Sequence, residues 1–381
     1  MVLSPKRQTS YTNSRLLTLG NLIFMKRLLL AFLMIGLVSC SSEDTVPQGR
    51  GGRVGIKQNQ DWLIPVGEVF DGGPGRDGIP SLSNPELLDA SQAGFLFDPE
   101  LVLGYYDGNT AVAFPHQVLD WHEIINQRVN SSLIVITYCP LTGTGIGLSQ
   151  EIDNLETEFG VSGLLYNNNL IAFDRDTQSN WSQMSLKAVN GPLIGTEMPT
   201  FQLVETRWLA WKTMYPETKV VSTDTGWDRP YGSYPYGDFR TNNNNLFFPL
   251  STDDPRLARK ERVHGVLIDE KAKVYRFSSF ESNDNSLIMD SFQGEHIVVV
   301  GNKSDFMVSF LATLPDGTKR NFFAINEGRA ILTDDQGNKW DIFGYPTSNS
   351  LEVPRLQATQ SFMGYWFAWG AFYPTPEIYG F

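Results

Sequence analysis

The sequence predicts an α+β, β-rich fold made of internally duplicated half-domains packed with pseudo-two-fold symmetry. The segment 206–216 returns at 363–374, and both Trp208 and Trp211 recur 158 positions later. Glycine and proline are frequent, with 34 and 21 residues, whereas long amphipathic helices are scarce. Because the repeat is much longer than a solenoid unit, it indicates two copies of a half-domain.

The chain is expected to divide into four parts. These are a spurious N-terminal extension at 1–24, a lipoprotein signal peptide at 25–39, a lipidated tether at 40–60, and a single domain at 61–381 with halves at about 95–225 and 260–381.

The signal peptide is predicted from the residues that precede Cys40. Met25-Lys26-Arg27 is a basic start, and the apolar run at 28–37 is too short to span a bilayer. Leu37-Val38-Ser39-Cys40 resembles the bacterial lipoprotein box, whose cysteine is lipidated after cleavage. We therefore expect an acylated Cys40, carrying for example palmitate, that anchors the mature chain to a membrane.

The net negative charge of the chain limits the classes of ligand that it can bind. The full chain carries a net charge of −12, which becomes −17 without residues 1–39 because they hold five basic and no acidic residues. Such a charge excludes nucleic acid and anionic lipid as ligands. The expected location is the bacterial cell envelope, with the protein lipid-anchored at the periplasmic face or at the outer-membrane surface.

The body of the chain alternates short strands with a few helices. β-branched and aromatic runs predict strands at 111–114, 133–138, 219–222, 296–300 and 306–311. Pro115 suits the first turn of a helix over 115–127, and Tyr-Pro pairs are expected to stop the two repeat helices, 201–214 and 361–372.

The first half carries the residues that suggest chemistry. Cys139 closes the strand at 133–138, and His122 lies on the predicted helix before it, with Glu123 beside it and Asn126 one helical turn away. Once Cys40 is lipidated, Cys139 is the only thiol left. We expect Cys139 and His122 to converge, either as a thiol nucleophile with Asn126 or Glu123 nearby or as two ligands of a soft transition metal. The alternative is a buried, inert thiol.

Several motifs together resemble the bacterial and archaeal family called domain of unknown function 3179. The matching segments span roughly residues 70–380 and are 77–80, 84–85, 121–126, 137–141, 161–166, 174–183, 229–231, 235–236, 260–263 and 366–369. The family pattern implies a second cysteine three residues after the first, but Thr142 stands there and excludes dithiol chemistry. The resemblance implies no activity.

Three functions are compatible with these observations. The first is an envelope enzyme or soft-metal protein that uses Cys139 and His122. The second is a non-catalytic envelope protein that binds a small molecule, a glycan or a peptide between Trp and Tyr side chains. The third is a structural component of the envelope.

Overall fold

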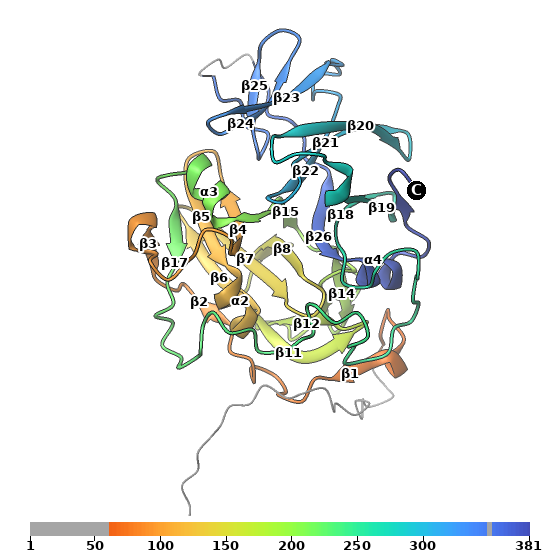
Figure 1. Cartoon of the computed structure of the whole chain (residues 1–381). Coiled ribbons are helices and arrows are strands. Elements are labelled where there is room, and N and C mark those ends of the chain that lie inside the picture. Colours follow the sequence, from red (N-terminus) through yellow and green to blue (C-terminus); the bar gives the residue numbers. More distant parts are fainter. Residues whose placement is uncertain (1–60, 349–352) are drawn as a thin grey trace, which may run out of the picture. The chain divides into compact units, whose positions relative to one another are not determined.

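The computed structural model describes residues 61–348 and 353–381 (Figure 1). Internal contacts separate Met1–Thr45 from Val46–Phe381, and every described residue belongs to the second unit. The expected extension, signal peptide, Cys40 and tether lie outside the described residues. Within those residues, no helix is long and apolar enough to cross a bilayer.

The prediction of a β-rich fold is confirmed, because short strands in several sheets dominate the described chain (Figure 1). Three sheets have five strands each. In order across each sheet, they are β1 (Val69–Asp71), β11 (Phe159–Tyr166), β12 (Asn169–Asp174), β13 (Asn180–Ser182) and β14 (Lys187–Asn190); then β15 (Thr200–Phe201), β8 (Thr144–Ser149), β7 (Ser132–Cys139), β6 (Ile124–Val129) and β2 (Leu82–Ser83); then β16 (Val204–Arg207), β4 (Leu101–Tyr106), β5 (Ala111–Pro115), β17 (Lys219–Val221) and β3 (Leu87–Asp89).

Smaller sheets follow later in the chain. They are the four strands β26 (Gln360–Tyr365), β18 (Arg262–Ile268), β19 (Lys271–Arg276) and β27 (Glu377–Ile378); the three strands β20 (Ser286–Phe292), β21 (Glu295–Gly301) and β22 (Met307–Leu311); and the three strands β23 (Phe322–Glu327), β24 (Ala330–Asp334) and β25 (Lys339–Asp341). A separate hairpin joins β9 (Glu151–Ile152) to β10 (Leu155–Glu156). All five predicted strands are present as β5, β7, β17, β21 and β22.

The helices in the described residues are short. They are α2 (His116–His122), α3 (Trp208–Met214), α4 (Trp366–Phe372) and the 3-10 helices η1 (Val66–Glu68), η2 (Ala90–Gln92) and η3 (Phe277–Ser279). The predicted helices 201–214 and 361–372 are wrong in their first halves, which form β16 and β26. Antiparallel pairing with β4 and β18 decides this, since it gives a ladder partner to the backbone groups that face those strands.

The predicted helix 115–127 is also wrong in its second half. It ends at His122 because Glu123 adopts a left-handed backbone with φ of 57°. The β-branched Ile124 and Ile125 then begin β6, which pairs antiparallel with β7. His122 and Asn126 therefore lie on different elements and do not share a helix face.

Two buried tryptophans fix the helices that follow β16 and β26. Gly104 on β4 lies against the ring of Trp211 on α3, and Gly265 on β18 lies against the ring of Trp369 on α4. Trp211 shares a hydrophobic cluster with residues of β21, β22 and β24, and Trp369 shares one with residues of β7, β8 and β12. The two helices thereby join the earlier and later sheets into a continuous core.

A long segment without helix or strand, residues 223–261, connects β17 to β18; we call it the crossing loop. Its contacts place it over α2 and the end of β7, because Ser233 accepts a hydrogen bond from Trp121 and Tyr234 donates one to Pro140 (Figure 1). Irregular segments of this length in a compact domain are uncommon and are usually functional. The candidate sites lie beside it.

Candidate functional site

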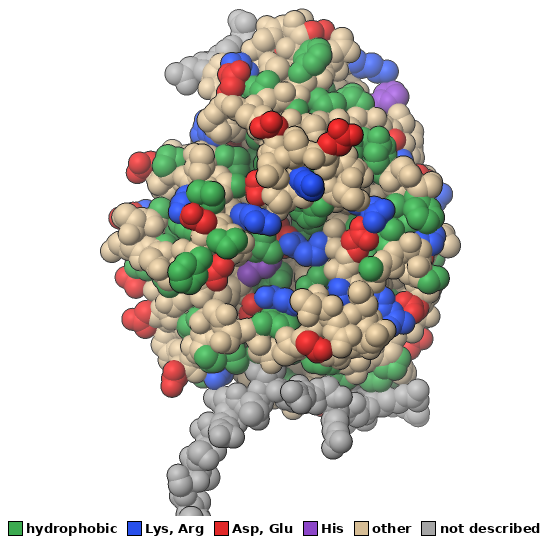
Figure 2. Space-filling model, viewed as in Figure 1, with side chains coloured by type: hydrophobic (Ala, Val, Ile, Leu, Met, Phe, Trp, Pro, Cys, Tyr) green, Lys and Arg blue, Asp and Glu red, His purple; other side chains and the backbone are tan. Residues whose placement is uncertain are grey.

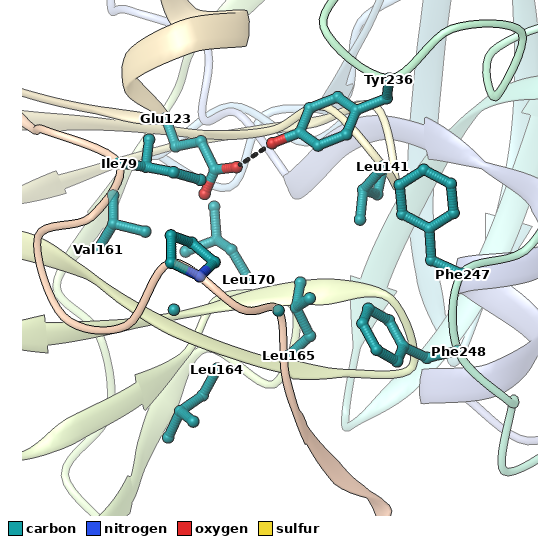
Figure 3. Close-up of a pocket in the computed structure, with 13 residues that line it drawn as sticks. Ile79, Glu123, Leu141, Val161, Leu164, Leu165, Leu170, Tyr236, Phe247 and Phe248 are labelled. Atoms are coloured by element: carbon teal, nitrogen blue, oxygen red, sulfur yellow. Dashed lines mark hydrogen bonds between the residues drawn. The ribbon is translucent and has the colours of Figure 1, made fainter. Parts of the chain in front are cut away.

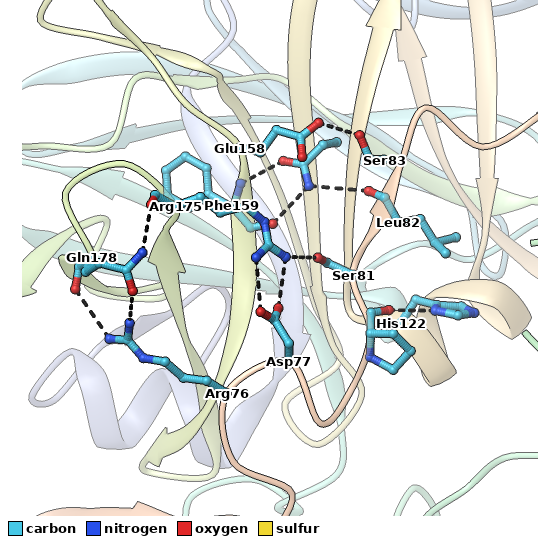
Figure 4. Close-up of polar contacts among 12 residues, drawn as sticks. Arg76, Asp77, Ser81, Leu82, Ser83, His122, Glu158, Phe159, Arg175 and Gln178 are labelled. Atoms are coloured by element: carbon cyan, nitrogen blue, oxygen red, sulfur yellow. Dashed lines mark hydrogen bonds and ion pairs between the residues drawn. The ribbon is translucent and has the colours of Figure 1, made fainter.

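His122 is held by two hydrogen bonds that leave no free ring nitrogen. Nδ1 lies 2.7 Å from the carbonyl oxygen of Pro80 and must donate to it (Figure 4). Nε2 therefore accepts from the Tyr231 hydroxyl at 2.6 Å. Burial lowers the pKa of His122 to about 4, although the bond to Pro80 opposes this. The ring is therefore neutral and ties α2 to the segment before β2 and to the crossing loop.

Asn126 joins three strands. Its Oδ1 accepts from the Phe159 amide at 2.8 Å, and its Nδ2 donates to the Phe159 carbonyl at 2.9 Å and to the Leu82 carbonyl at 3.3 Å (Figure 4). These bonds use the side chain fully. Asn126 thus links β2, β6 and β11, and its side-chain hydrogen bonds hold these strands together.

Cys139 ends β7 and is buried. Its Sγ donates to the Asn168 carbonyl at 3.5 Å, and no hydrogen bond joins it to His122 within the described chain. Burial raises the pKa of the Cys139 thiol to about 11, with the nearby Glu123 carboxyl adding to the shift. The thiol is therefore protonated at neutral pH.

The described ranges contain no group of three or more His, Cys, Asp or Glu side chains placed to hold a metal ion. A soft metal on Cys139 and His122 would need ligands beyond these two. A catalytic or metal role for the pair stays a prediction.

We expect Cys139 to be unreactive in the folded protein. In a Cys40→Ser chain, where Cys139 is the sole thiol, iodoacetamide at pH 8 should modify the urea-unfolded protein and leave the native protein unmodified, since both burial and the protonated state protect Sγ. Mass spectrometry of the two samples measures this. Equal labelling of native and unfolded protein would contradict the buried geometry.

Glu123 belongs to a different environment from its neighbour His122. Its carboxyl faces a small apolar cavity of about 40 Å³, and Oε1 accepts from the Tyr236 hydroxyl at 3.0 Å (Figure 3). The walls are formed by aliphatic and aromatic side chains, namely Ile79, Leu141, Val161, Leu164, Leu165, Leu170, Phe247 and Phe248. Burial raises the pKa of Glu123 to about 7 despite the bond from Tyr236. The space admits a few water molecules and no larger ligand.

This carboxyl predicts a pH dependence of stability. Because the folded pKa lies above the unfolded one, the folded protein binds the extra proton between about pH 4.5 and 7, so stability falls as pH rises through that window. In the wild type, the free energy of unfolding should therefore fall by on the order of 3 kcal/mol across this window. Glu123→Gln, which keeps an acceptor for Tyr236 but does not titrate, should abolish this fall. Urea unfolding at pH 5 and pH 8 measures it, and an unchanged pH slope in the variant would contradict the prediction.

A larger cavity of about 370 Å³ lies between α2, the crossing loop and the adjoining ends of β4, β18 and β26. Figure 2 shows blue Lys and Arg side chains and a purple His in the hollow at the centre of this face. We call it the cationic cavity; its lining residues are Glu100, Leu101, His116, Gln117, Asp120, Tyr138, Gly232, Tyr234, Arg240, Lys260, Arg262 and Tyr365.

Arg240 enters the cavity from the crossing loop. Its guanidinium pairs with Asp120 of α2 and lies 3.8 Å from the centroid of the Tyr234 ring. Burial raises the pKa of Asp120 to about 6, against the opposing effect of Arg240. The pair fixes a planar donor at the wall of the cavity, which is the geometry that suits a carboxylate or phosphate.

Arg262, the first residue of β18, forms the second pair. It contacts Glu205 of β16, whose other oxygen lies 3.3 Å from Nε2 of His116. Burial, followed by the charges of Arg262 and Arg240, keeps the pKa of His116 well below its ordinary value, so the ring is neutral. Glu205 therefore neutralises Arg262.

Lys260 differs because its Nζ has neither a hydrogen-bond partner nor an ion-pair partner in the described chain, whereas Arg262 and His116 both contact Glu205. The side chain is 8% exposed, and Nζ lies 3.1 Å from the centroid of Phe239 and 4.7 Å from that of Phe367. Burial lowers the pKa of Lys260 to about 7. A buried amine without a polar partner destabilises a fold, so it is typical of a functional site.

Tyr138 and Tyr365 also belong to this lining. Together with the arginines and Lys260 they make the cavity rich in donors. The sequence analysis did not predict this site, because residues 260–263 and 235–236 served there only as family motifs. An unbroken Lys-Glu-Arg at the start of a strand beside a long loop is nevertheless a usable signal.

The fold and this lining define a β-rich protein with a cationic cavity that opens on its surface. The chain belongs to the family described as protein of unknown function (DUF3179), whose pattern matches residues 76–376, and this confirms the resemblance drawn from the motifs. All the lining residues of the cationic cavity fall inside the matched region. No curated protein and no solved structure matches the chain.

Proposed function

We propose that this protein is a non-catalytic binding protein that takes up a small anionic molecule, with a carboxylate, phosphate or sulfate group, in the cationic cavity. The single observation that carries the proposal is the convergence of Arg240, Lys260 and Arg262 on one cavity, where the buried amine of Lys260 has no hydrogen-bond partner among the described residues. A bound anion would supply Lys260 with the negatively charged partner that it lacks. Asp120 and Glu205 are the corresponding partners of Arg240 and Arg262.

Three physical arguments support this ligand class. Guanidinium groups bind planar oxyanions through paired hydrogen bonds, and Tyr138 and Tyr365 in the lining carry two further hydroxyl donors. A volume of about 370 Å³ suits a small ligand and excludes a folded partner.

The test is a thermal-shift screen at low ionic strength with millimolar phosphate, acetate, malonate and glucuronate. At least one anion should raise the melting temperature of the wild type with a saturable concentration dependence. Lys260→Met should lose the shift, whereas the exposed Lys271→Met should keep it. Equal shifts in both variants would mean a general salt effect and would sink the proposal.

We propose further that the protein is held in the bacterial cell envelope by a lipid on Cys40, at the periplasmic face or the outer-membrane surface. The support is the basic, apolar and Leu-Val-Ser-Cys succession of residues 25–40. Intact-mass measurement of the membrane fraction should show loss of residues 1–39 and gain of acyl chains, and Cys40→Ser should abolish both. An uncleaved or unacylated chain would contradict this.

The described chain also supports the proposal of two related halves with pseudo-two-fold symmetry. Sheet order β16-β4-β5-β17 matches β26-β18-β19-β27, and in each the last two strands are parallel. Trp181 lies 5.7 Å from Phe159 at 66°, and Trp340 lies 5.7 Å from Phe322 at 66°. Superposition of the halves in a crystal structure should place Trp208 on Trp366 and Trp211 on Trp369. If these tryptophans occupy unrelated positions, the proposal of two related halves is wrong.

A further inference from the structure

The ion pair between Asp120 and Arg240 belongs both to the fold and to the lining of the cationic cavity. Asp120 lies on α2 and Arg240 on the crossing loop, and both residues line the cavity. The two partners differ in exposure, because the side chain of Asp120 is 5% exposed and that of Arg240 is 31% exposed. The acid is therefore the buried partner, and the guanidinium is the partner that a ligand in the cavity can reach.

Arg240 is oriented by contacts that use only part of its donor capacity. Its Nη2 donates to Oδ1 of Asp120, and its guanidinium lies 3.8 Å from the centroid of the Tyr234 ring. A guanidinium has further N–H groups in the same plane, and the bond to Asp120 engages one of them. An anion that binds these groups would lie on the same guanidinium as the Asp120 carboxylate.

We propose that a bound anion and Asp120 share Arg240, so that the protein takes up a proton at Asp120 when the anion binds. This inference rests on the proposed binding function and adds the regulation of the same site by pH. Two negative charges on one guanidinium repel each other, and this repulsion disfavours the ionised form of the more buried carboxylate. Protonation of Asp120 relieves the repulsion and leaves the charge of Arg240 to the ligand.

The surroundings of Asp120 favour this proton uptake. Burial raises the pKa of Asp120 to about 6, although Arg240 opposes the shift. The groups that interact electrostatically with this carboxyl are Glu123 at the end of α2, Tyr138 of β7, Tyr234 and Arg240 of the crossing loop, and Tyr365 of β26. Further titratable or charged groups of the lining are Glu100, His116, Lys260 and Arg262. Burial raises the pKa values of the three tyrosines, so these stay neutral and Arg240 is the cation that keeps Asp120 ionised.

Proton uptake makes anion binding stronger at lower pH. The complex holds the proton at a higher pH than the free protein does, because the anion raises the pKa of Asp120. Affinity should therefore increase as pH falls from 7.5 toward about 6, and should level off below the pKa of the free protein. Asp120→Asn keeps an acceptor for Arg240 without the charge. This variant should bind anions more tightly than the wild type at pH 7.5.

Isothermal titration calorimetry with sulfate and with glucuronate, which both stay ionised between pH 5.5 and 7.5, tests the coupling. Titrations at pH 6.5 in buffers of different ionisation enthalpy count the protons, and the wild type should take up about half a proton more per anion than Asp120→Asn. From pH 7.5 to 5.5, the affinity of the wild type should rise roughly fivefold more than that of Asp120→Asn. Lys260 is present in both proteins, so the difference between them reports Asp120.

Glu123→Gln is the matched control, because it removes a neighbouring buried carboxyl that faces the small apolar cavity instead. It should keep the proton uptake and the pH dependence of the wild type. A wild type that takes up no proton at pH 6.5 overturns the inference whatever the variants do. Weaker binding by Asp120→Asn than by the wild type at pH 7.5 would also overturn it, since Asp120 would then help to hold the anion.

The outcomes separate this inference from the binding proposal. If the anions bind but the wild type and Asp120→Asn show equal proton uptake and equal pH dependence, the coupling is wrong and the binding proposal stands. If neither sulfate nor glucuronate binds to the wild type, the coupling is wrong, and the thermal-shift screen decides the binding proposal by itself.

Discussion

Gly104→Ala and Gly265→Ala should each destabilise the fold by about 3 kcal/mol, the upper end of typical overpacking effects. A Cβ atom at Gly104 would lie 2.1 Å from the ring of Trp211, and one at Gly265 would lie 2.1 Å from the ring of Trp369. Both tryptophans are fully buried in clusters that join the earlier and later sheets, so neither ring can move without disturbing a close-packed core.

The measurement is equilibrium unfolding in urea, followed by tryptophan fluorescence and by circular dichroism. Gly67→Ala is the matched control, because its Cβ would meet nothing within 4 Å. The control should unfold within about 0.5 kcal/mol of the wild type. If Gly104→Ala unfolds as late as Gly67→Ala, the close packing of α3 on β4 is wrong.

Lys260→Met should stabilise the protein at neutral pH while it removes ligand binding. The unfolded lysine keeps a pKa near 10.5, whereas the folded one lies at about 7, so the unfolded chain binds the extra proton between these values. Wild-type stability therefore rises with pH across that window. Methionine packs on Phe239 without a charge, and we expect a gain on the order of 2 kcal/mol at pH 7 after allowing for the lost cation–π contacts.

The pH dependence distinguishes this explanation from better packing alone. The advantage of Lys260→Met should shrink between pH 7 and pH 9.5, because the wild-type penalty fades as pH approaches the unfolded pKa. Urea unfolding at the two pH values measures it. An advantage that is constant with pH, or a destabilised variant, would contradict a buried amine of lowered pKa.

The sequence predicted strands well where the local signal and the tertiary structure agree. The β-branched run of β7 gives a strand in any context. The segments that form β16 and β26 were misassigned because their identity depends on pairing with β4 and β18, which lie about a hundred residues away. Helix α2 ends before Glu123 because this residue adopts a left-handed backbone conformation. Nothing in the residue type predicts that conformation, since glutamate rarely adopts it.

The candidate site was harder to predict than the fold. Cys139 and His122 attracted interest as residue types, yet their surroundings hold the thiol protonated and the ring neutral. The cationic cavity brings together Asp120 and Arg240, which are 120 positions apart and meet only through the course of the crossing loop. The burial of the Lys260 amine and its lack of a hydrogen-bond partner among the described residues cannot be obtained from one sequence.

Isothermal titration calorimetry of the wild type and Lys260→Met, with the anion that gives the largest thermal shift, tests the central claim most directly. The account predicts saturable binding of one anion per chain to the wild type and at least a tenfold weaker affinity in the variant, with Lys271→Met equal to the wild type. Undetectable binding to the wild type, or equal affinity in all three proteins, would contradict an anion site in the cationic cavity.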